Sequence, residues 1–261
     1  MSHHDSGTGF SNMQALLKQK VLLAALSFFL SVSAVELAHA ELQEQRGECV
    51  VLLHGMGRSA LAMKPLQWHL EEQGYSVINE SYSSLSYSIP ELATMAAGGG
   101  LAACRERGLL RAHFVTHSLG GILVRQYAKG RSVPGLERVV MLGPPNQGSQ
   151  VADYYGSIEF LDGLRPQVMD GLRTGENSLA QRLGPVDFEL GIIAGTVNRH
   201  AMIPGFPQEP GDGTVSVAET VVPGMVDFLE MATTHTFMIW SPQVMDQVVH
   251  FLQWGGFNRE S

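Results

Sequence analysis

The chain has 261 residues, of which 44% are hydrophobic and 16% are charged, a composition that suits one globular domain with a substantial core. Its formal net charge is -8, and its Lys and Arg residues are scattered along the sequence. Because nucleic-acid binding needs a basic surface, this charge argues against a nucleic-acid partner.

Residues 1–40 have the layout of an export signal. Two lysines precede an apolar stretch, residues 21–35, and the small residues Ala38 and Ala40 follow it, as expected of a signal peptide that is cut before residue 41. This interpretation predicts a periplasmic or secreted protein, with Met13 as an alternative start of translation. The apolar stretch is short for a membrane span, which needs about 20 residues. An uncleaved membrane anchor is the alternative.

Apolar runs alternate with helical patterns in the rest of the chain, which we expect to form one domain, residues 41–261. Parallel strands that are covered on both faces are continuous apolar runs. The sequence predicts six of them, at residues 48–53, 75–78, 110–117, 136–142, 188–194 and 228–231. Strands that alternate with helices predict an α/β fold with a doubly wound, mostly parallel sheet.

Helices are predicted where apolar residues recur three or four positions apart. They lie at about residues 61–73, 90–107, 119–129 and 244–254. Three glycines, Gly98 to Gly100, interrupt the second helix, so we expect its middle to be weak or broken. In residues 147–187 the alternation stops, and two short helices are expected on either side of Pro166. This segment either packs into the core or forms a small cap that shapes an apolar substrate groove.

A single serine stands between the third predicted strand and the helix that follows it. Residues 116–121 read THSLGG. A side chain displayed at such a sharp turn needs a strained backbone and small neighbours two residues away. Gly120 is one such neighbour, whereas Thr116 replaces the glycine that is more usual before the serine. Ser118 is therefore either a nucleophile or an ordinary serine at the start of a helix.

A serine hydroxyl becomes a nucleophile when an imidazole takes its proton and a carboxylate orients that imidazole. Both groups must follow strands at the carboxyl edge of the sheet, where Ser118 is displayed. Asp212 follows the fifth predicted strand, and His235 follows the last. A turn aspartate and a solvated loop histidine are the simpler alternatives. Asp227, the main rival acid, would begin a strand and lie at the opposite edge.

Hydrolysis also requires an oxyanion hole, which is a pair of fixed backbone N–H groups. Leu119 offers one N–H group from the first turn of its helix. We expect the second from Met56 in the loop after the first strand, because the neighbouring glycines let the backbone approach a substrate. His54, Gly55 and His117 are predicted to line the substrate site, with His117 in a supporting role.

Five segments together resemble the bacterial lipase and esterase branch of the α/β-hydrolases. They read LLHGMG (52–57), VTHSLGG (115–121), GPPNQGS (143–149), DGTV (212–215) and TTHTF (233–237). The order Ser118, Asp212, His235 is that of the superfamily, and similar lipases carry an apolar oxyanion donor after His-Gly, which supports Met56. The resemblance implies a shortened α/β-hydrolase fold of about six strands with a small helical cap.

The resemblance also implies a disulfide bond. The sheet order of these hydrolases places the strand that begins at Cys49 beside the strand that begins near Leu110. Parallel neighbours have their amino ends together, so Cys49 and Cys104 are expected to meet, and export permits the bond. Two buried thiols are the alternative.

The function implied is an exported serine hydrolase that cleaves small-molecule or lipid esters through an acyl-enzyme on Ser118. An acyltransferase or an amidase would use the same three groups, and a catalytically silent lipid- or partner-binding protein is the hypothesis from another class. No metal or organic cofactor is expected, because His and Cys do not cluster at ligand spacing and the glycine runs lack phosphate-loop order. Peripheral membrane contact, a structural calcium and the oligomeric state stay open.

Overall fold

The computed structural model describes residue 20 and residues 47–157, 167–175, 178–200 and 209–259. The predicted signal peptide apart from residue 20, and residues 158–166 and 176–177 of the predicted cap, lie outside the described residues. The chain divides into two units, Met1–Gln45 and Arg46–Ser261, and the fold described below is that of the second. In the part of the chain that is described, no helix has the length and apolar character needed to cross a membrane.

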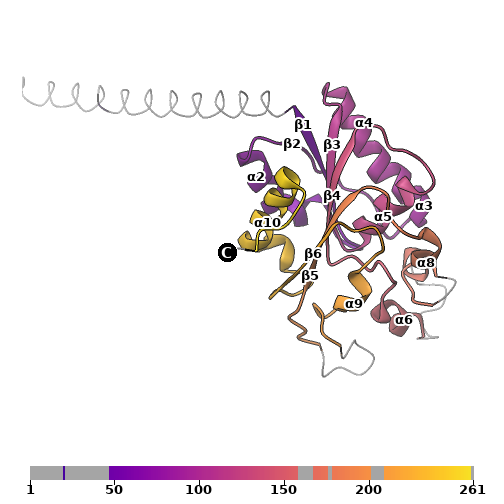
Figure 1. Ribbon diagram of the computed structural model, residues 1–261. Helices are drawn as coiled ribbons and strands as arrows, with labels where there is room; N and C mark the ends of the chain where they lie inside the picture. Colours follow the sequence, from indigo (N-terminus) through magenta and orange to yellow (C-terminus); the bar gives the residue numbers. More distant parts are fainter. Residues whose placement is uncertain (1–19, 21–46, 158–166, 176–177, 201–208, 260–261) are drawn as a thin grey trace, which may run out of the picture. The chain divides into compact units, whose positions relative to one another are not determined.

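Six strands form one parallel sheet within the described residues (Figure 1). They are β1 (Glu48–Leu53), β2 (Ser76–Ile78), β3 (Arg111–His117), β4 (Leu136–Leu142), β5 (Glu189–Gly195) and β6 (Asp227–Met231). Their order across the sheet is β2-β1-β3-β4-β5-β6, and every neighbouring pair is parallel. All their carboxyl ends therefore lie at one edge, which confirms the predicted doubly wound parallel sheet.

Helices cover both faces of this sheet. One face carries η1 (Ala60–Met63), α2 (Lys64–Glu72), η4 (Met238–Trp240) and α10 (Pro242–Trp254), and the other carries α3 (Ile89–Leu92), η2 (Ala93–Gly98), α4 (Gly99–Glu106) and α5 (Leu119–Ala128). Side chains alternate between the faces of a strand, so Val50 and Leu52 of β1 are buried under α2 and α10, whereas Val51 and Leu53 are buried under α4 and α5. Burial on both faces explains the continuous apolar runs of the sequence.

The second predicted helix does not break at its glycines. It continues from α3 through the π-helical η2 into α4. A Cβ atom added to Gly98 would lie 2.8 Å from the Tyr127 ring, and one added to Gly100 would lie 2.3 Å from a methyl group of Val51. Of the weak or broken middle that was expected, the break is absent and a π-helical stretch takes its place. These glycines permit close packing against α5 and β1, and that packing outweighs their low helix propensity.

Among the described residues of the segment 147–187, which was predicted to hold two short helices, three short helices follow β4. They are α6 (Gln150–Gly156), α7 (Gln167–Asp170) and α8 (Leu179–Leu183). Arg125 of α5 is buried, and its guanidinium donates hydrogen bonds to the carbonyl oxygens of Asn146, Ala180 and Gly184 at 2.8, 3.1 and 2.8 Å. Burial lowers the pKa of Arg125 to about 10, so it stays charged at neutral pH and ties α8 to the core. The cap function of this segment stays a prediction.

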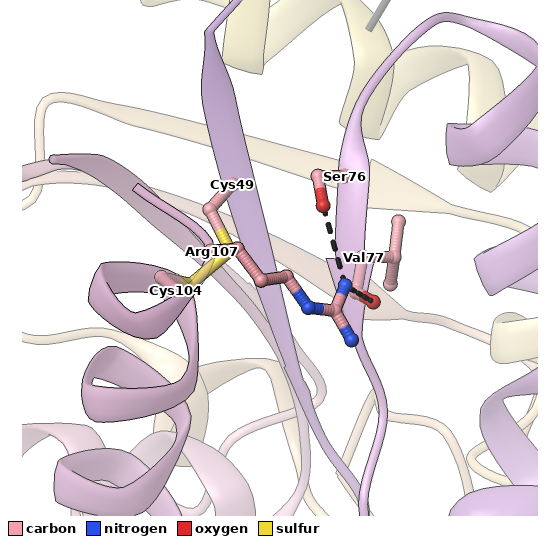
Figure 2. The surroundings of a disulfide bond; sticks show 5 residues. All are labelled: Cys49, Ser76, Val77, Cys104 and Arg107. Atoms are coloured by element: carbon pink, nitrogen blue, oxygen red, sulfur yellow. Dashed lines mark hydrogen bonds between the residues drawn. A yellow bond between two sulfur atoms is a disulfide. The ribbon is translucent and has the colours of Figure 1, made fainter. Parts of the chain in front are cut away.

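Cys49 and Cys104 form the predicted disulfide bond (Figure 2). The bond joins β1 to α4, its Cα atoms are 5.9 Å apart, and both cysteines are buried. Arg107, at the end of α4, donates hydrogen bonds to the hydroxyl oxygen of Ser76 and the carbonyl oxygen of Val77 at 3.3 and 3.2 Å. The end of α4 is therefore attached to two neighbouring strands at the amino edge of the sheet.

Candidate active site

The predicted site residues follow strands at the carboxyl edge of the sheet. Ser118 comes directly after β3, Asp212 lies between β5 and β6, and His235 lies beyond β6. His54 and Met56 belong to the loop after β1. Because the strands are parallel, one edge carries all five residues.

Ser118 occupies a strained turn between β3 and α5. Its backbone has φ 53° and ψ -119°, and among the described residues it is the one residue other than glycine with a positive φ. Its N–H group donates to the carbonyl oxygen of Leu142 at 2.9 Å, and its own carbonyl oxygen accepts from the N–H group of Gly121 at 3.0 Å. The side chain is partly exposed, so the turn displays the hydroxyl at the edge of the sheet.

The two positions that lie two residues before and two residues after Ser118 differ in whether a side chain fits there. A Cβ atom on Gly120 would lie 2.6 Å from the carbonyl oxygen of Leu53, so no larger residue fits there. Thr116 is fully buried in β3, where it pairs with Leu53 of β1 and Met141 of β4. The strand thus accommodates a side chain at the position where glycine is more usual. The hydroxyl of Thr116 has no hydrogen-bond partner among the described residues.

Asp212 and His235 form a hydrogen-bonded pair. His235 Nδ1 lies 2.6 Å from Asp212 Oδ2, and the side chains are 13% and 1% exposed. The other carboxylate oxygen accepts the N–H groups of Thr214 and Val215 at 2.9 and 2.8 Å. Because an ionised carboxylate only accepts, the ring proton of neutral His235 lies on Nδ1 and leaves Nε2 as a proton acceptor. Such a histidine can act as a general base.

The loop that carries Asp212 is fixed by a capping box at α9 (Val217–Thr220). The buried carboxylate of Glu219 accepts the N–H groups of Ser216 and Gln150, each at 2.7 Å. Burial raises the pKa of Glu219 above its usual value. Since Gln150 is the first residue of α6, this carboxylate joins the Asp212 loop to the predicted cap. The Ser-x-x-Glu pattern of Ser216 and Glu219 is the sequence signal of such a box.

Gly143 is a site residue whose role the sequence analysis missed. It follows β4 with φ +55°, and a Cβ atom added to it would lie 2.9 Å from Asp212 Oδ2 and 3.1 Å from His235 Nδ1. Any other side chain would be strained by the backbone and would press on the Asp212–His235 hydrogen bond. The rival acid Asp227 begins β6 at the opposite edge, where it accepts from the Phe257 N–H group at 2.7 Å.

His117 contacts His235 through a hydrogen bond and through its ring. Its Nε2 donates to the carbonyl oxygen of His235 at 2.9 Å, and the two ring centroids are 4.7 Å apart. Burial first, and then the neighbouring His235, hold the pKa of His117 well below its usual value, so the ring is neutral at neutral pH. His117 is 3% exposed, which favours the supporting role over direct contact with a substrate.

The loop after β1 reaches Ser118. A Cβ atom added to Gly55 would lie 3.3 Å from Ser118 Cβ and 3.0 Å from His117 Nδ1, so the backbone of Gly55 packs closely against both residues. Leu119 is the first residue of α5, and the first N–H groups of a helix have no partner within it. The oxyanion roles of Met56 and Leu119 stay predictions.

The segment that leads from β2 to α3 contacts the loop after β1 and fixes its position. This contact was not predicted from the sequence. Tyr82 stacks on His54 with ring centroids 3.9 Å apart, and the hydroxyl of Ser84 accepts from the Gly57 N–H group at 2.9 Å. His54 is 1% exposed, so its ring contacts Tyr82 instead of solvent. No sequence pattern signals these contacts, because they join residues that are 27 and 28 positions apart.

No protein-family model matches the sequence, and no curated protein matches it. Solved structures are similar to it in fold. The mature form of lipase BlEst2 from Bacillus licheniformis has 18% identity and a TM-score of 0.61, over 79% of this chain and 91% of that one. Phospholipase PlaB from Legionella pneumophila has 20% identity and a TM-score of 0.60, over 78% of this chain and 57% of that one. An extracellular α/β-hydrolase from a Paenibacillus species has 13% identity and a TM-score of 0.51, over 78% and 98%.

Proposed function

We propose that this chain, which has the α/β-hydrolase fold, is a serine hydrolase that cleaves carboxylic esters through an acyl-enzyme on Ser118. The observation that carries the proposal is the Asp212–His235 pair at the same edge as a serine with strained backbone. Solved structures of a lipase and a phospholipase with the same fold support ester chemistry.

In this mechanism His235 Nε2 takes the proton of Ser118 as Oγ attacks the ester carbonyl carbon. Asp212 holds the ring in the required tautomer and stabilises the imidazolium that forms. The N–H groups of Met56 and Leu119 bind the negative charge that develops on the carbonyl oxygen. The tetrahedral intermediate then collapses, and His235 gives the proton to the leaving alcohol. Water, activated by the same base, releases the acid and restores Ser118.

Apolar side chains near His235 support a lipid ester as the substrate. Leu61, Phe237 and Trp240 are 77%, 55% and 49% exposed, and Phe237 is two residues from His235. The ring nitrogen of Trp240 donates to the carbonyl oxygen of Ala62 at 2.9 Å, which holds its ring beside η1, the short helix that also carries Leu61. An exposed tryptophan, which has an apolar ring and a polar N–H group, suits the boundary between water and lipid, and Leu61 and Phe237 add apolar surface beside it. We propose that this surface makes peripheral contact with aggregated substrate.

Export is the second part of the proposal. Disulfide bonds persist in oxidising compartments, so the Cys49–Cys104 bond supports a periplasmic or secreted location. The predicted signal peptide agrees with it.

An ester panel tests the proposal. Purified protein is assayed with p-nitrophenyl esters from acetate to palmitate, with and without a detergent interface, and with an acyl p-nitroanilide. We expect ester turnover that favours longer acyl chains at the interface and no anilide cleavage. Transfer of the acyl group to added glycerol would favour an acyltransferase, and cleavage of the anilide an amidase. A protein that binds the long-chain ester without turnover would be a silent binder, contrary to the proposal.

Replacing Gly143 by alanine is expected to lower kcat for the best ester by about tenfold or more, because misplacing a catalytic group by about 1 Å costs up to about 10² in rate. The added methyl group would press on both Asp212 and His235. Gly130→Ala is the matched control, since Gly130 also has a positive φ, +66°, but has open space around it. Equal kcat values in the two variants would contradict the role of Gly143.

A further inference from the structure

We infer that Tyr82 is a positioning residue for the oxyanion hole: it fixes His54 and, through His54, the peptide group that carries the Met56 N–H. This inference deepens the proposed function and rests on it.

Tyr82 holds His54 in three ways. The two rings are stacked, with an interplanar angle of 10°. The N–H group of Tyr82 donates to His54 Nε2 at 3.3 Å, and the phenol hydroxyl donates to the His54 carbonyl oxygen. Burial lowers the pKa of His54 and raises that of Tyr82, so a neutral ring and a protonated phenol persist at neutral pH. Since Nε2 accepts, the ring proton lies on Nδ1.

His54 in turn fixes the peptide group between Gly55 and Met56. Its Nδ1 donates to the Gly55 carbonyl oxygen at 2.9 Å, and the N–H group of Arg58 donates to the same oxygen at 3.3 Å. A trans peptide is planar, and its C=O and N–H bonds point in opposite directions. Holding the Gly55 oxygen therefore holds the Met56 N–H, which belongs to the same plane. Gly55 lies against Ser118, and the proposed mechanism therefore places this N–H beside the reacting carbonyl of a bound ester.

The rest of the loop is held from the same segment. The Ser84 hydroxyl accepts from the Gly57 N–H group at 2.9 Å, the Ser81 hydroxyl accepts from the Ala60 N–H group at 2.9 Å, and Asn79 Nδ2 donates to the Ala60 carbonyl oxygen at 3.0 Å. These bonds anchor the backbone after Met56, whereas Tyr82 anchors it before Met56. An oxyanion donor held on both sides needs no reorganisation during the reaction, which is the condition under which such donors are most effective.

The test compares Tyr82→Phe with Tyr87→Phe. Both tyrosines lie in the segment between β2 and α3, and Tyr87 is 41% exposed. Activity is expressed per active site, which is titrated with a fluorophosphonate, so that a misfolded fraction does not count. For Tyr82→Phe we expect kcat to fall about tenfold while KM changes by less than about twofold, because the lost interaction acts in the transition state. Tyr87→Phe should match the wild type.

Two further measurements distinguish a role of Tyr82 in positioning the Met56 N–H group from a role in protein stability alone. An alkyl boronic acid forms a tetrahedral adduct with the serine, and we expect its inhibition constant to rise in Tyr82→Phe by the same factor as kcat falls. His54→Asn keeps an amide donor near the place of Nδ1, so it should retain about tenfold more kcat than His54→Leu.

Unchanged kcat per active site in Tyr82→Phe, a change in KM alone, or equal kcat in the two His54 variants would overturn the inference. Lack of ester turnover and of fluorophosphonate labelling in the wild type would overturn the proposed function and this inference with it.

Discussion

Replacing Ser118 by alanine is expected to lower ester turnover by at least about 10⁴-fold, since removing the nucleophile of a Ser-His-Asp triad leaves only the contribution of the oxyanion hole and of binding. The fold should persist, because the hydrogen bonds of Ser118 to Leu142 and Gly121 use its backbone. The measurement is the rate of p-nitrophenyl ester hydrolysis together with the thermal unfolding curve. Ser132→Ala, at an exposed serine after α5, is the matched control and should be fully active.

The backbone at Ser118 allows a second readout in the same series. Alanine keeps the strain of φ 53°, whereas glycine relieves it, so we expect Ser118→Gly to raise the free energy of unfolding by about 1 kcal/mol relative to Ser118→Ala. Turnover that survives in both variants would exclude Ser118 as the nucleophile. Equal stability of the two variants would contradict a strained turn.

Reducing the Cys49–Cys104 disulfide is expected to lower the free energy of unfolding by about 4 kcal/mol in the chain-entropy model, for a sequence separation of 55 residues. For a domain of this size such a loss lowers Tm by about 10 °C. The bond constrains the unfolded chain, and its removal frees β1 from α4 at the edge opposite the site. We therefore expect kcat at low temperature to stay near its wild-type value.

The measurement is thermal unfolding of the wild type with and without a reductant. The variant with Cys49→Ala and Cys104→Ala is the control, and its Tm should not respond to the reductant. Two free thiols in the unfolded, unreduced wild type, or a Tm that the reductant does not change, would contradict this role of the disulfide.

The sheet was predictable because its signal is local and strong. The segment Val139–Leu142 of β4 is buried on both faces and must therefore be apolar at every position. The ends of β1 and β4 follow from the glycines and prolines after them, and the predicted bounds of the strands agree with the observed ones to within a residue or two. The sequence predicted a weak or broken helix at Gly98 to Gly100, and the helix is π-helical up to Gly98 but unbroken. Glycine has a low helix propensity, but here it also permits a close approach to Tyr127 and Val51 that stabilises the helix.

Of the candidate site, the sequence alone predicted the groups that carry the proposed chemistry. The spacing around Ser118 and the position of His235 after the last strand are local signals, and the Asp212–His235 hydrogen bond agrees with them. The supporting residues were not predictable in the same way. Gly143 lies against Asp212 and His235, which follow it by about 70 and 90 residues. Tyr82 contacts the ring of His54, which is 28 residues before it. Such contacts follow from the fold and leave no local pattern.

The central claim is that Ser118 is the activated nucleophile, and covalent labelling tests it most directly. Purified protein is treated with a fluorophosphonate ester, and the labelled peptide is identified by mass spectrometry. We predict one phosphonyl group per chain, on Ser118, with labelling slowed by His235→Ala and prevented by Ser118→Ala. Labelling of a different residue, or a wild type that does not react while it remains folded, would contradict the account.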